Sequence, residues 1–223
     1  NGLDVDMIFL NAIKFCSNGF SENIGDKIRA KKINNERNKS RILKYLATRP
    51  KFSGSACTKV FKKSFLIHEK LSFPSDRRLS EDLGFVAECI YKASSFHAYD
   101  DVLYEYRQNR KDSLTHSISK ESLDGKYLFV YDIMHNFLEN DKLCDQYSKY
   151  MLSFAAYEYA ILLWNWEVYS HSSLSAYDFS KIDNLRNVLR YGKSVRMKCI
   201  YAISHLVGIL RTAKLISCIK RCN

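Results

Sequence analysis

Proline and glycine are scarce in this sequence, with 2 Pro and 8 Gly in 223 residues. So few turn-forming residues argue against a many-turned all-β fold and against a long flexible linker. The seven cysteines form no C-x-x-C pair, and no two histidines stand three or four residues apart, so the usual zinc spacings are absent. We expect reduced thiols, a cytosolic location and no secretory signal peptide.

Acidic residues are missing from the C-terminal stretch. Asn184–Asn223 holds nine Lys and Arg and no Asp or Glu, and Asp26–Lys51 holds ten Lys and Arg against two acids. The formal net charge is +11. Two basic segments of this kind favour an anionic partner such as phospholipid, lipid-linked pyrophosphate or nucleic acid, although a solvated lysine-rich surface would look the same.

Periodicity predicts strands in the first half of the chain and helices in the second. The expected strands are Asp4–Phe15, Cys57–Lys62 and Ser94–Arg107, the last with a turn or bulge at Asp100–Asp101. The expected helices are Lys39–Thr48, a segment starting at Ser80, Glu121–Asn140, Cys144–Ser170, Lys181–Tyr191 and Val195–Lys220. Asp178 and Gly192 suit the two ends of the helix at Lys181–Tyr191.

The segment Ser80-Glu81-Asp82-Leu83 allows two interpretations. Ser80 can cap a helix, and acids in the first turn suit the helix dipole, so the acidic pair has a purely structural explanation. The alternative is that a carboxylate between two strand-like runs stands at the mouth of a cleft, where it can act as a general base.

Three further segments surround this acidic pair in a characteristic order. They are A-C-T-K-V-F-K-K at Ala56–Lys63, F-P at Phe73-Pro74 and Y-E-Y-R-Q-N-R-K-D-S at Tyr104–Ser113. This order resembles family 2 glycosyltransferases, inverting GT-A enzymes common in bacterial capsule and cell-wall polysaccharide assembly. The resemblance runs from about Val5 to the C-terminus and lacks the family's N-terminal half, which holds the donor nucleotide.

The resemblance implies a fold and a division of the chain. We expect an α/β fold: the C-terminal part of a GT-A, Rossmann-like mixed-sheet domain, followed by a mainly helical region. The acceptor-side part would take residues 1–118, and the helical region, with a basic amphipathic membrane-associating helix, residues 119–223. Without its nucleotide-binding strands the sheet would expose an apolar edge and face, so we expect poor solubility.

The resemblance also assigns residue roles. Asp82 would be the catalytic base, and Glu81 its neighbour that orients the acceptor or holds structure. Arg107, Gln108, Arg110, Ser113 and Lys59 would bind the substrate or the leaving diphosphate, although Asp112 replaces a common Gly and weakens a phosphate role. A solvated basic loop and an edge-strand lysine are the plain alternatives.

Asp4-Val5-Asp6 looks like the D-x-D metal motif of the family but stands in the wrong place. The family's metal motif ends a strand, whereas this pair begins one. We therefore assign no metal ligand here. A divalent metal, Mg or Mn, is expected for the full enzyme, with ligands outside this chain.

The C-terminal segment favours a membrane surface. Cys199–Leu210 is twelve residues without a charge, too short for a span of about 20 residues. Basic residues around it suit a helix lying on an anionic membrane, whereas packing on the protein's own core is the alternative.

These patterns predict a hexosyltransferase-type enzyme in surface polysaccharide biosynthesis, peripheral at the inner face of the cell membrane. It would transfer a sugar from a nucleotide-sugar donor to a saccharide or lipid-linked acceptor, and this chain would be an incomplete enzyme. The alternative is an inert membrane-binding or interaction module derived from such a transferase. Nucleic-acid binding is disfavoured because no recognition motif is present.

Overall fold

The computed structural model describes residues 3–15, 21–23, 27–52, 54–77, 79–107, 118–139, 145–172 and 177–221. The chain divides into two compact units. The first, called here the sheet unit, runs to residue 116 except for residues 47–52 and 77–80. These two short segments and residues 117–223 form the second, called the helical unit.

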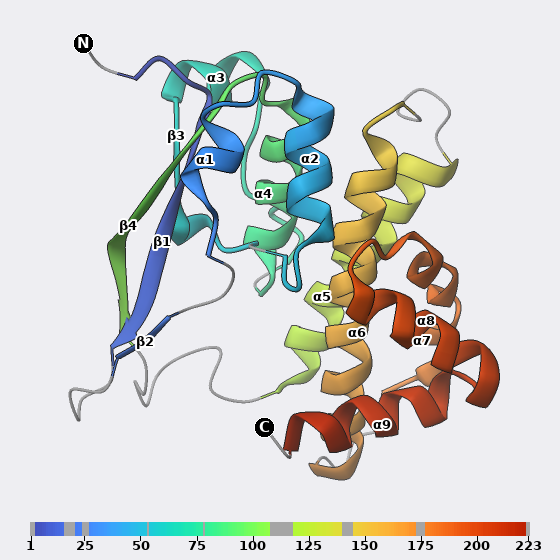
Figure 1. The fold of residues 1–223 in the computed structure, drawn as a ribbon. Helices are drawn as coiled ribbons and strands as arrows, with labels where there is room; N and C mark the ends of the chain where they lie inside the picture. The colour runs from blue at the N-terminus through green and yellow to red at the C-terminus, as the bar shows by residue number, and fades with distance from the viewer. Residues whose placement is uncertain are drawn as a thin grey trace. The chain divides into compact units, whose positions relative to one another are not determined.

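The sheet unit combines four strands with short helices (Figure 1). The strands are β1 (Met7–Phe15), β2 (Ser21–Asn23), β3 (Lys59–Phe61) and β4 (Phe96–Arg107). The helices are α1 (Ala30–Ile33), α2 (Lys39–Thr48), the 3-10 helix η1 (Ala56–Thr58), α3 (Lys63–His68) and α4 (Glu81–Lys92). The strands expected within Asp4–Phe15 and Ser94–Arg107 and the helix expected at Lys39–Thr48 are thereby confirmed.

Strand β1 is the centre of a mixed sheet. Strand β4 pairs with it in parallel along one edge, while β3 and β2 pair antiparallel with the beginning and the end of the other edge. Among the described residues the outer edge of β4 has no strand partner, and Val102 and Leu103 are exposed there. The fold is α/β with a mixed sheet, as expected. The poor solubility expected from an exposed sheet edge remains a prediction.

Aromatic packing joins α4 to the sheet. Phe85 of α4 meets Phe61 of β3 edge-on at 5.1 Å between ring centroids and stacks on Phe73 at 4.2 Å. Val86, Ala87 and Ile90 are buried on the same helix. The apolar stripe of α4 therefore packs in the core of the sheet unit. This packing fixes the orientation of the helix and of its first turn.

Asn11 organises the irregular pairing between β1 and β4. The register shifts on both sides of Asn11, which confirms the irregularity expected near Asp100-Asp101. The buried Asn11 amide nitrogen donates to the carbonyls of Tyr99 and Asp100 at 2.9 and 3.0 Å. Its carbonyl oxygen accepts from the Ile28 amide at 3.1 Å. One side chain thus satisfies the backbone groups that the shifted strands leave unpaired.

Replacing Asn11 with Ala should destabilise the protein by about 2 kcal/mol, because several buried backbone groups lose their partners. Urea unfolding of the variant measures this loss. The matched control is Asn35→Ala: Asn35 is exposed in the turn after α1, and its replacement should cost less than about 0.5 kcal/mol. Equal effects at the two positions would show that the Asn11 contacts carry no net stability.

The helical unit is built around one long helix. Its elements are α5 (Lys120–Met134), the π-helix η2 (His135–Glu139), α6 (Ser148–Ser172), α7 (Phe179–Asp183), the 3-10 helix η3 (Arg186–Tyr191), α8 (Val195–Val207) and α9 (Ile209–Arg221). Helix α6 contacts α5, α7, η3, α8 and α9 and is buried on nearly all sides, as a helix that is apolar all round must be.

Three expectations differ from the structure in detail. The strand expected at Cys57–Lys62 begins only at Lys59, because the Thr58 hydroxyl donates to the Ser55 carbonyl at 3.1 Å and helps close a 3-10 turn. The helix expected at Lys181–Tyr191 is divided into α7 and η3, although Asp178 does cap α7.

The third difference concerns the C-terminal segment. The single helix expected there is broken at Gly208, where φ is +80°, a conformation that residues with a Cβ rarely adopt. Helix α9 then turns one face inward against α6, burying Ile209, Ala213 and Ile216. Packing on the protein's own core, the alternative to a membrane-lying helix, therefore accounts for this face. Among the described residues no helix is long and apolar enough to cross a bilayer.

Candidate active site

The acidic pair opens helix α4, as the sequence predicts. Glu81 and Asp82 are its first two residues, and both side chains are half-buried. Ser80 before them has a φ of +66°, so it does not adopt the extended backbone typical of an N-cap residue. The start of α4 is thus fixed by its packing and by the contacts of Asp82 described next.

Asp82 holds the turn that precedes β3. Its Oδ2 accepts a hydrogen bond from the backbone N–H of Ala56 at 3.0 Å, which satisfies the first donor of η1. Within the described residues Oδ1 has no hydrogen-bond partner. The carboxylate is therefore fixed in place through one oxygen, and no described residue occupies the other.

Lys59 is buried beside Asp82 and is 6% exposed. Its Nζ donates to the Ser55 carbonyl at 2.7 Å and to the Thr58 hydroxyl at 2.8 Å. Burial lowers the pKa of Lys59 from 10.5 to about 7, and the nearby Asp82 and Cys57 offset part of that effect. The amine thus shifts between charged and neutral near physiological pH, next to the predicted catalytic base.

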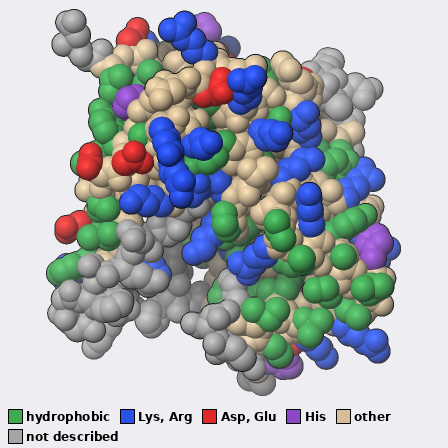
Figure 2. Space-filling model, viewed as in Figure 1, with side chains coloured by type: hydrophobic (Ala, Val, Ile, Leu, Met, Phe, Trp, Pro, Cys, Tyr) green, Lys and Arg blue, Asp and Glu red, His purple; other side chains and the backbone are tan. Residues whose placement is uncertain are grey.

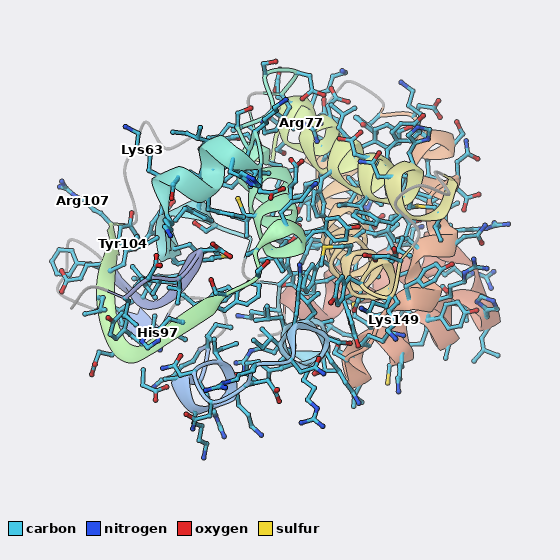
Figure 3. The ribbon with its side chains drawn as sticks, turned by 90° about the horizontal axis from the view of Figure 1, so that it is seen from above. Lys63, Arg77, His97, Tyr104, Arg107 and Lys149 are labelled. Carbon is cyan, nitrogen blue, oxygen red and sulfur yellow. The ribbon has the colours of Figure 1, made fainter. Side chains whose placement is uncertain are left out.

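Cys57 and Tyr104 complete this cluster. A hydrogen bond between the Tyr104 hydroxyl and Cys57 raises the pKa of Tyr104 above its usual value, and burial is a second, smaller cause. Tyr104 comes from β4 and lies opposite Ala12 of β1. Figure 3 shows Tyr104 and Arg107 along the same strand. We define the Asp82 cluster as Cys57, Lys59, Asp82 and Tyr104.

The lysine predicts a measurable pH dependence of stability. A base whose pKa is lower in the folded than in the unfolded chain binds fewer protons when folded, so the free energy of unfolding rises as the pH increases from about 7 toward 10. Between pH 6 and 8.5 it should rise by about 2 kcal/mol more in the wild type than in Lys59→Met. Urea unfolding of both proteins at the two pH values measures this, and parallel pH profiles would contradict a buried Lys59.

The remaining predicted site residues are not members of the Asp82 cluster, and some of them lie outside the described residues. Arg107 is the last residue of β4, is exposed, and pairs in register with Phe15. Gln108, Arg110 and Ser113 belong to 108–117, outside the described residues. No hydrogen bond or ion pair reaches the Glu81 side chain from the part of the chain that the structure describes. Of the predicted residues, the structure brings together Asp82 and Lys59.

The acidic pair near the N-terminus has structural partners. Both Ser94 and Ser95 donate their backbone N–H to Asp6 Oδ2, at 2.8 and 3.0 Å, and Asp4 forms an ion pair with Lys62. In the described ranges no group of three His, Cys, Asp or Glu side chains could hold a metal ion. Asp4 and Asp6 therefore both have partners within the chain.

Sequence reasoning missed Cys57 and Tyr104 as members of the cluster. Tyr104 alternates with Tyr106 along β4, which predicts that the two share one face but not what that face meets. Cys57 stands in the A-C-T-K segment that supports the resemblance, but the resemblance assigned it no role. In comparisons with protein-family models, curated proteins and solved structures, nothing matched this chain.

Proposed function

We propose that this chain is the acceptor side of an inverting glycosyltransferase, with Asp82 as its base. The observation that carries the proposal is the Asp82 carboxylate, half-buried at the start of α4 and anchored through Oδ2, with no hydrogen-bond partner at Oδ1 among the described residues. The order of motifs around it, together with the mixed α/β sheet, supports the finer assignment to the GT-A type.

The chemistry requires one well-placed carboxylate. In a single in-line displacement the acceptor hydroxyl attacks the anomeric carbon, and the bond from that carbon to the leaving diphosphate breaks. The hydroxyl proton passes to the base, here Asp82 Oδ1. The hydrogen bond from the Ala56 N–H fixes the orientation of the carboxylate.

We place the donor-nucleotide site and any metal ligands outside this chain. A divalent metal, Mg or Mn, would neutralise the departing diphosphate. The described residues offer no group that fits such an ion, so the step proposed for this chain is limited to binding the acceptor and removing its proton.

The proposed location is the cytoplasmic face of an anionic membrane. Figure 2 shows Lys and Arg side chains gathered over α1 and α2. The exposed basic residues of this region are Lys27, Arg29, Lys31, Lys32, Arg37, Arg41 and Lys44. Such a patch attracts acidic lipid headgroups, and lipid-linked acceptors would be presented there.

The test is the release of nucleoside diphosphate from a panel of nucleotide sugars. The assay contains the full-length protein, Mg or Mn, and saccharide or lipid-linked acceptors. The proposal expects release from one donor class that depends on the acceptor. Vesicle binding without any release would instead favour the inert membrane-binding module.

A further inference from the structure

The helical unit contains a pocket that the proposed sugar transfer does not use. It has a volume of about 340 Å³ and lies between η3 and the junction of α8 and α9. Its lining residues are Arg186, Asn187, Arg190, Tyr201, Ser204, His205, Gly208 and Ile209. That volume is at the lower end of the roughly 300–1,000 Å³ typical of small-molecule sites.

One wall of the pocket is formed by two arginines of η3. Arg186 Nη1 lies 3.4 Å from each carboxylate oxygen of Asp183, and the Arg186 side chain is 62% exposed. Arg190 donates to the Tyr191 hydroxyl and lies over the Tyr191 ring at 4.8 Å. Each guanidinium has five N–H donors, so most of these donors remain available to a ligand.

The opposite wall comes from α8 and the start of α9. The His205 and Tyr201 rings lie 4.4 Å apart, and the Ser204 hydroxyl already donates to the Tyr201 carbonyl at 2.6 Å. Helix α8 ends at Val207 and helix α9 begins at Ile209, so the negative end of one helix dipole and the positive end of the other both lie beside the pocket and oppose each other. None of the described residues that line this cavity is acidic, and Asp183 is the carboxylate that pairs with Arg186.

We propose that this pocket binds a phosphate or pyrophosphate group. Arg186 and Arg190 both line this cavity, and guanidinium forks match the geometry of phosphate oxygens. The same group is carried by free phosphates and by lipid headgroups. Leu206, 83% exposed, and Leu210, 47% exposed, are next in sequence to lining residues and offer an apolar contact for a lipid. The proposal is independent of the sugar-transfer activity.

The test uses two probes on the complete chain. Inorganic pyrophosphate is titrated by isothermal calorimetry, and vesicles of phosphatidylcholine with and without phosphatidic acid are used in flotation. Saturable pyrophosphate binding without flotation assigns the site to free phosphate ligands. Flotation that requires phosphatidic acid assigns it to headgroups.

Three variants separate the pocket from general charge attraction. Arg190→Gln keeps the Arg186–Asp183 pair intact, and it should weaken the binding of whichever probe binds the wild type about tenfold. The double variant with Arg186→Gln as well should not bind that probe. The matched control is Arg196→Gln, an exposed α8 position outside the pocket, with an expected change below about twofold. Circular dichroism should show the same helix content in each. No saturable binding of either probe, or equal losses at Arg190 and Arg196, would overturn the proposal.

Discussion

On the proposed function, replacing Asp82 with Asn should lower the rate of sugar transfer on the order of 10²–10⁴-fold, because the amide cannot accept the acceptor's proton. The fold should survive. The side-chain oxygen of the introduced asparagine can still accept the hydrogen bond from the Ala56 N–H, which is 3.0 Å from the carboxylate in the wild type. Steady-state kinetics and urea unfolding of the same preparation measure the two effects.

Glu81→Gln is the matched control for that substitution. Glu81 is the adjacent residue in the same first turn, is similarly half-buried, and has no polar contact to the described residues. Its loss of turnover should stay below about tenfold, since the proton would still pass to Asp82. If Asp82→Asn kept full turnover, or Glu81→Gln caused the larger loss, the assignment of the base would be wrong.

Replacing Gly125 with Ala should destabilise the protein by about 3–4 kcal/mol. A Cβ at this position of α5 would lie 2.0 Å from the Leu79 carbonyl oxygen and 2.9 Å from its carbon. These are backbone atoms, so no change of rotamer relieves the clash, and α5 or the segment at residues 77–80 must shift. The gain in helix propensity, about 1 kcal/mol, is far too small to compensate.

Gly84→Ala provides the opposite control within α4. The nearest atom to a new Cβ there is Pro74 Cγ at 3.8 Å, an ordinary contact. Helix propensity should therefore dominate, and the variant should gain about 0.5–1 kcal/mol in the free energy of unfolding. A Gly125→Ala protein as stable as Gly84→Ala would show that α5 does not approach Leu79 this closely.

Periodicity predicted the elements whose burial follows a simple pattern. Helix α2 has its predicted bounds, and β1, β4 and the start of α4 lie where alternation and helical spacing put them. The break at Gly208 was missed because the segment around it keeps an uninterrupted apolar and basic pattern. Only its φ of +80° reveals the turn between α8 and α9. A glycine within a helical pattern is compatible with both outcomes.

The candidate site shows a different limit. The sequence made Asp82 a candidate base through its neighbours in the chain, but the contact of Asp82 with Ala56 joins residues 26 positions apart. The low pKa of Lys59 follows from burial against Ser55 and Thr58, which no spacing encodes. The arginine pocket likewise depends on how η3 meets the α8–α9 junction. Such properties come from tertiary packing rather than from local pattern.

The measurement that tests the central claim most directly is proton NMR of the product formed by the full-length protein from an α-linked nucleotide sugar. A single displacement assisted by the Asp82 carboxylate predicts a β-linked product, and it predicts that the Asp82→Asn protein forms almost none. An α-linked product, or no product from any donor and acceptor class, would contradict the account.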